Sequence, residues 1–125
     1  MSRVVHFEIP CAEPERAAKF YADVFGWRIN KWDGTEEYWM VATGKEGGPE
    51  PGIDGGLLRR TDRFPTVVNT IDVPSIDESV RAITDGGGII LVPKFALPGV
   101  GYLAYFKDPE GNTFGIMQAD PDAAA

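Results

Sequence analysis

The sequence predicts an α+β fold in which one strand, one helix and three further strands, a βαβββ unit, occur twice in tandem. Glycine and proline number 15 and 10 of the 125 residues, about one fifth of the chain against a usual ~12%, which favours short strands and turns over a helical bundle. A strand, a helix and a terminating glycine recur at a constant spacing. Three strand-sized segments then follow each helix.

The first helix is predicted after the β-rich segment RVVHFEI, residues 3–9. Pro14 suits the first helical turn, and Glu15 favours the positive end of the helix dipole. Gly26 is suited to end the helix. Between them, one apolar stripe with the spacing i, i+3, i+4 and i+7 is formed by Ala17, Phe20, Tyr21 and Val24.

The same order recurs in the second half of the chain. TVVNTIDV, residues 66–73, predicts a strand, and SIDE, residues 75–78, has the spacing of a helix capping box. Three glycines at 86–88 end this second helix. The offset of 62 residues that relates Gly26 to Gly88 also relates Val5 to Val67, so we interpret the chain as a duplication.

The remaining segments complete the two units. WRINKW, EYWMVAT and IDGGLLR follow the first helix, and IILVPKF, GYLAYFK and TFGIMQ follow the second. Loops are predicted at residues 44–52 and 95–101. We therefore expect a single domain over residues 1–125, with the first unit at about 3–60, the second at about 65–118, and a disordered tail at 119–125.

Charge and composition exclude several classes of partner. A net charge of −7 and a pI of about 4.6 disfavour a nucleic-acid surface, which needs clustered Lys and Arg. No apolar run approaches membrane-spanning length, so we expect no membrane partner. The single cysteine, Cys11, excludes an internal disulfide and fits a reducing compartment. The expected location is the cytoplasm.

Two motifs, HFEIPCAEPERAAKFYADVFGW and YFKDPEGNTFGI, together with the paired units, resemble the vicinal oxygen chelate superfamily over residues 3–118. This superfamily includes glyoxalase I, extradiol dioxygenases and bleomycin-resistance proteins. The resemblance implies a cleft lined by the sheets on the side away from the helices, and a homodimer that covers exposed sheet edges. It also implies that metal-using members hold a divalent ion on four ligands, one from the first and one from the fourth strand of each unit.

This ligand pattern is broken here. The first-strand position of the first unit is His6, which matches, but its counterpart in the second unit is Val68. The last-strand position, four residues after the glycine of the DPEGN turn, is Gly115, and the remaining position lies in GIDGGLLR, where Asp54 offers a carboxylate. We therefore predict no bound metal and no other cofactor. Only in a metal-dependent alternative would His6 and Asp54 be ligands, with Glu8 and a partner chain completing the set.

Alternation along the first strand separates a polar face from a helix-covered face. It places His6 and Glu8 toward the cleft, and the apolar Phe7 and Ile9 against the helix. In the second unit the same alternation turns Thr70 toward the cleft. His6 is either part of a ligand site or a remnant of an ancestral metal site, and both interpretations stay open. The predicted ligand-binding residues are His6, Glu8, Trp39, Asp54, Thr70 and Tyr102.

We expect from this a metal-independent protein that binds a small organic molecule, apolar or cationic, in the cleft between the two units. Two alternatives remain. One is a divalent-metal-dependent lyase, isomerase or dioxygenase of the same superfamily. The other is an accessory or regulatory module without catalysis. Whether the chain catalyses a reaction is left open by its sequence.

Overall fold

The computed structural model describes residues 1–34 and 36–124 of the chain. These residues form two compact units. Residues 6–67 make up what we call the first unit, and residues 1–5 with the chain from residue 68 onward make up the second unit. The first residues therefore group with the second unit, whereas the sequence placed them in the first. A hydrogen bond from the Asp72 amide to the Arg3 carbonyl, at 2.8 Å, joins them to it.

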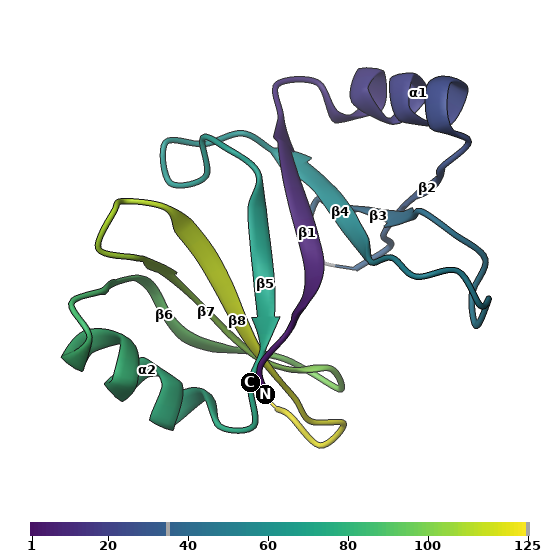
Figure 1. Ribbon diagram of the computed structural model, residues 1–125. Helices are drawn as coiled ribbons and strands as arrows, with labels where there is room; N and C mark the ends of the chain where they lie inside the picture. The colour runs from purple at the N-terminus through teal and green to yellow at the C-terminus, as the bar shows by residue number, and fades with distance from the viewer. Residues whose placement is uncertain (35, 125) are drawn as a thin grey trace. The chain divides into compact units, whose positions relative to one another are not determined.

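The first unit has the predicted βαβββ order (Figure 1). Its strands follow the order β2-β3-β4-β1, in which β1 and β4 are parallel and the other neighbours antiparallel. The elements are β1 (Val4–Cys11), α1 (Pro14–Phe25), β2 (Arg28–Lys31), β3 (Trp39–Ala42) and β4 (Asp54–Arg59).

Helix α1 begins and ends as predicted, with Pro14 in its first turn and Gly26 at its end in the left-handed conformation (φ 74°). Phe7 and Ile9 of β1 pack on the helix-covered side, which confirms their predicted facing. The predicted helix stripe is only half right. Ala17 and Tyr21 pack against the core together with Ala18, whereas Phe20 and Val24 stay exposed, because the two small alanines bring their own side of the helix closest to the sheet.

The second unit repeats this order. Its strands follow the order β5-β8-β7-β6, with β5 parallel to β8. Helix α2 contacts β6, β7 and β8 of the same unit, as Figure 1 shows. The elements are β5 (Val68–Asp72), α2 (Ile76–Asp85), β6 (Ile89–Leu97), β7 (Gly101–Lys107) and β8 (Thr113–Ala119).

The cap of α2 and the turn between β7 and β8 are both confirmed. The Ser75 hydroxyl accepts a hydrogen bond from the Glu78 amide at 3.2 Å, which satisfies one of the open amides at the helix start. In the DPEGN turn the Asp108 carboxylate accepts from the amides of Glu110 and Asn112 at 2.8 and 2.9 Å. The turn therefore closes the predicted hairpin, with Lys107 paired to Thr113.

The structure differs from the sequence prediction in two irregular segments. Residues 95–97 belong to β6, where Phe95 pairs with Leu103, so the loop is only the turn at 98–100. Of the tail predicted to be disordered, residues 119–125, the last lies outside the described residues, and Ala119 belongs to β8. The Ala123 carbonyl accepts from the Gly99 amide at 3.0 Å, and Ala123 is buried. In both cases backbone pairing and burial override the local glycine and proline signal. The segment at residues 44–52 is a loop, as predicted.

Within the described part of the chain, no helix has both the length and the apolar character needed to span a membrane.

Candidate functional site

The polar face of the first unit is built by alternate residues of two parallel strands. His6 and Glu8 lie on β1, and their register partners on β4 are Asp54 and Gly56. Glu8 is 8% exposed although it is acidic, and such groups are almost never buried to this degree unless they are partnered. The predicted trio of His6, Glu8 and Asp54 is thus brought together on one pair of strands.

The imidazole of His6 is hydrogen-bonded to Tyr38, which is not among the predicted ligand-binding residues. Its Nε2 lies 2.7 Å from the Tyr38 hydroxyl, with the two rings stacked at 14° and 6.5 Å between centroids. Gly56 makes this possible, because a Cβ at this position would overlap the Tyr38 hydroxyl and ring. Strand alternation could have indicated this residue. Tyr38 comes one residue before the core residue Trp39, so its side chain lies on the opposite face, over Gly56 of β4.

Burial favours the neutral form of His6. Desolvation lowers the pKa of His6 from its ordinary value, while the carboxylates of Glu8 and Asp54 raise it in part. A neutral imidazole has one donor and one acceptor nitrogen. The Nε2–hydroxyl contact can therefore form with the phenol as donor or as acceptor, and the pair can pass on a proton or bind a polar group.

The carboxylate of Asp54 also has a structural role. Its Oδ1 accepts hydrogen bonds from the Thr43 amide at 2.9 Å and from the Thr43 hydroxyl at 3.3 Å. The single proton of the Thr43 hydroxyl is shared between this carboxylate and the Ile53 carbonyl, which lies 2.6 Å away. Asp54 thereby joins the end of β3 to the start of β4.

The two predicted aromatic residues lie on the helix-covered faces. Trp39 is 5% exposed in the core of the first unit. Tyr102 packs in the core of the second unit with Ile76 of α2. Thr70, also in the second unit, is 2% exposed and lies beside Gly115. The structure therefore places Trp39 on the face opposite His6, and Tyr102 on the face opposite Thr70, because neighbouring residues of a strand point to opposite sides.

Strand register also settles which position of the first unit corresponds to Gly115. Thr70 pairs with Gly115 in the second unit, and Glu8, its counterpart at the offset of 62 residues, pairs with Gly56 in the first. By this register the equivalent of Gly115 is Gly56, two residues after Asp54. Neither glycine carries a donor atom, and the third position, Val68, is buried and apolar.

Of the four family positions, His6 alone offers a ligand atom. Throughout residues 1–34 and 36–124, no three His, Cys, Asp or Glu side chains gather in a way that could hold a metal ion. The donor set of this chain therefore does not fit the four-ligand centre that the resemblance implies.

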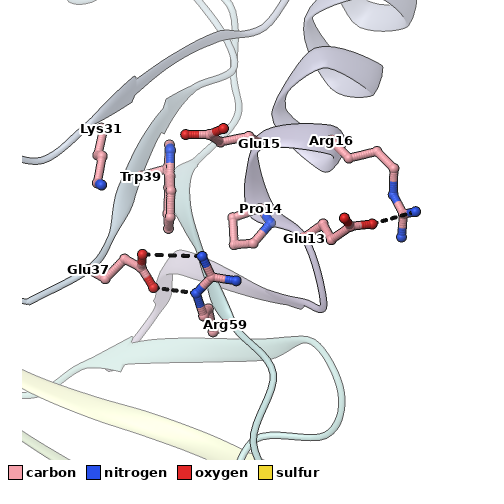
Figure 2. Close-up of a pocket in the computed structure, with 8 residues that line it drawn as sticks. All are labelled: Glu13, Pro14, Glu15, Arg16, Lys31, Glu37, Trp39 and Arg59. Carbon is pink, nitrogen blue, oxygen red and sulfur yellow. Dashed lines mark hydrogen bonds and ion pairs between the residues drawn. The ribbon is translucent and has the colours of Figure 1, made fainter.

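A depression lies at the start of α1, on the helix-covered side of the first unit (Figure 2). It has a volume of about 550 Å³, and Trp39 lies at its base with the Lys31 ammonium 5.3 Å from the ring centroid. The charged groups around it largely satisfy one another, as in the ion pair of Arg59 with Glu37. Its lining consists of Glu13, Pro14, Glu15, Arg16, Lys31, Glu37, Trp39 and Arg59.

The depression and the polar face differ in how exposed their charged side chains are. Around the depression the paired side chains are exposed, 57% for Arg59 and 42% for Glu37, so their pairing adds little stability. On the polar face the carboxylate of Glu8 is buried beside an imidazole. Because perturbed, buried titratable groups concentrate at functional sites, we take the polar face as the candidate site.

Comparisons with known proteins agree with this fold. The family model "Bleomycin resistance protein-like N-terminal" matches residues 3–44. A glyoxylase-like domain-containing protein of Didymella fabae is 34% identical over 116 residues, which cover 87% of this chain and 88% of that protein. Lactoylglutathione lyase GLX1 of Arabidopsis thaliana is 27% identical over 132 residues. That match covers 95% of this chain but only 45% of the plant protein.

Solved structures give the same picture at lower identity. Methylmalonyl-CoA epimerase of Streptomyces coelicolor superimposes with a TM-score of 0.69 at 15% identity, covering 98% of both chains. A glyoxalase/bleomycin resistance protein/dioxygenase superfamily member from Vibrio splendidus 12B01 superimposes with a TM-score of 0.65 at 20% identity, covering 96% of this chain and all of that one. Both likenesses concern the fold.

Proposed function

Because this chain belongs to the glyoxalase/bleomycin-resistance (vicinal oxygen chelate) superfamily, we propose that it binds a small organic molecule without the help of a metal ion. The site is the polar face that carries His6 and Glu8. One observation carries the proposal: three of the four family ligand positions, Gly56, Val68 and Gly115, have no donor atom, and the fourth, His6, is hydrogen-bonded to Tyr38.

The chemistry of the face favours a ligand that combines an apolar part with a positive charge. Glu8 and Asp54 supply carboxylates on either side of His6. Tyr38 supplies an aromatic ring, and Met40, two residues further along on the same face, is 49% exposed. Carboxylates attract a cation, and aromatic and thioether groups contact an apolar body. A small aromatic amine meets both requirements.

A thermal-shift experiment tests this ligand class. Benzylamine is compared with its uncharged isostere benzyl alcohol, since a ligand that binds only the folded chain raises its melting temperature. Benzylamine should stabilise the wild type more than benzyl alcohol, and Glu8→Gln should remove this difference. Glu37→Gln, at an exposed carboxylate on the helix-covered side, is the matched control and should retain it. Equal shifts from both compounds, or none, would contradict a cationic ligand.

Metal analysis tests the other half of the proposal. Protein purified without chelators is expected to contain no divalent ion in stoichiometric amount. One ion per chain in the wild type, lost in His6→Ala, would instead support the metal-dependent lyase, isomerase or dioxygenase. That alternative rests on His6, which matches the family position, and on the two carboxylates beside it.

The same proposal includes a homodimer in the cytoplasm. The dimer would cover strand edges that a small sheet otherwise leaves open, and light scattering on the eluting protein measures its mass directly. A mass of one chain at all concentrations would contradict it. Expression of a fluorescent fusion reports the compartment.

A further inference from the structure

We propose that Tyr38 takes the place of a metal ion as the partner of His6 and acts as the positioning residue of this site. The inference deepens the proposed function and rests on it for the role of the site in binding. It concerns a residue outside the ligand positions of the family. The juxtaposition that carries it is the phenol of Tyr38 lying across Gly56 with its hydroxyl on Nε2 of His6.

The space for the phenol comes from Gly56. In the second unit, the equivalent glycine, Gly115, is closely flanked by Thr70 Oγ1 and the Tyr105 ring, at 2.9 and 3.1 Å from where a Cβ would stand. In the first unit the corresponding space holds the Tyr38 side chain. At both positions a neighbouring side chain fills the volume that a ligand residue would need. Only in the first unit does the filling residue bind a histidine.

The backbone holds Tyr38 in this place from both sides. Its carbonyl accepts a hydrogen bond from the Trp32 amide at 2.7 Å. Two residues later, Met40 pairs with Gly56 in the register of β3 and β4. The phenol therefore projects from a fixed strand end, and its 2.7 Å contact fixes the orientation of the imidazole plane. A histidine held by a neighbour in this way presents a defined nitrogen to whatever it meets.

This arrangement also explains why His6 is not available as a metal ligand. The nitrogen that faces Tyr38 cannot bind an ion unless the phenol moves away, since both would need the same lone pair or the same direction of approach. The glycine at position 56 and the presence of Tyr38 are therefore linked, because the phenol occupies the space that a side chain at position 56 would need. A hydroxyl group now makes the contact that a cation would make.

The single histidine of the chain makes the contact directly measurable. In untagged, ¹⁵N-labelled protein, the two imidazole nitrogens give one pair of signals, and these report the hydrogen bond at Nε2. Tyr38→Phe, which keeps the ring and removes the hydroxyl, should shift the Nε2 signal. Gly56→Ala should shift it as well, because the added methyl group displaces the phenol. Gly44→Ala, with nothing within 4 Å of the added Cβ, should leave it unchanged.

An unchanged Nε2 signal in Tyr38→Phe would overturn the inference, and this variant decides the matter even where Gly56→Ala does not fold. Binding provides the second readout. With one hydrogen bond to the imidazole lost, Tyr38→Phe should bind benzylamine about threefold to tenfold more weakly, and equal affinity would refute the positioning role. Failure of the wild type to bind benzylamine would contradict the proposed function, whereas the imidazole spectrum tests the Tyr38 contact independently of any ligand.

Discussion

Gly115 lies beside Thr70 in the parallel register of β8 and β5, and a Cβ added to the glycine would stand 2.9 Å from the threonine Oγ1. The Tyr105 ring lies on another side, at 3.1 Å from the same point. The position at which the superfamily resemblance implies an acidic ligand is therefore closed by its neighbours. A longer side chain could enter only if Thr70 and Tyr105 moved.

This closure predicts that Gly115→Ala lowers stability. Overpacking costs about 1–3 kcal/mol, and the gain from replacing a glycine inside a strand, about 0.5–1 kcal/mol, offsets part of it. We expect a net loss of about 1 kcal/mol, measured by urea unfolding. Gly44→Ala, where the added methyl group meets open space, is the control and should change stability by no more than about 0.5 kcal/mol. Similar midpoints for the two variants would show that the site is not closed.

His6 predicts a dependence of stability on pH near neutrality. Burial lowers the pKa of His6 from its ordinary value of 6.5, so the unfolded chain takes up a proton first as the pH falls through 6.5. The folded state should lose stability over that range, and should show no contribution from His6 well above it. Between about pH 8 and about pH 5.5, the free energy of unfolding measured with urea should fall more for the wild type than for His6→Gln. Parallel curves for the two proteins would count against a buried neutral imidazole.

The DPEGN turn predicts a second dependence, in the acid range. Hydrogen bonds hold the pKa of Asp108 below its usual value, first from the Asn112 amide and then from its side chain and the amides of Glu110 and Gly111. Stability that Asp108 contributes above pH 3.8 is therefore lost as the pH falls below that value. Asp108→Asn keeps an acceptor oxygen but does not titrate, so it should lose less stability on acidification. Equal acid losses would contradict a role for the ionised carboxylate.

The ion pair of Glu37 with Arg59 predicts a small effect. Both side chains are largely exposed, so Glu37→Gln should change the free energy of unfolding by less than about 1 kcal/mol, and the difference should shrink at high salt. Benzylamine binding should be unaffected. If this variant instead abolished binding while Glu8→Gln did not, the ligand site would be the depression at the start of α1.

Much of the fold could be predicted because the signals were local and repeated. Pro14 and Gly26 mark the ends of α1, and Ser75 marks the start of α2. The same strand–helix–glycine order occurs twice, so each unit supports the interpretation of the other. The DPEGN turn likewise carries its own hydrogen bonds.

The site was harder to predict because its geometry depends on register between strands far apart in sequence. Asp54 was chosen for its carboxylate, but pairing with Glu8 shows that Gly56 is the equivalent of Gly115. Trp39 was grouped with the site as an aromatic residue, and a shift of one position gives Tyr38 instead. Since alternate residues of a strand face opposite sides, composition alone could not tell the two apart.

The end of the chain has a practical consequence for handling the protein. Ala123 is bonded through its carbonyl to Gly99, and the Asp120 amide donates to the Val100 carbonyl at 2.9 Å. These hydrogen bonds hold the segment after β8 against the turn between β6 and β7. A fluorophore or affinity tag joined directly after Gln118 would remove these hydrogen bonds and destabilise the hairpin of β6 and β7. Met1, whose side chain is exposed, is the better point of attachment for immobilisation and single-molecule measurements.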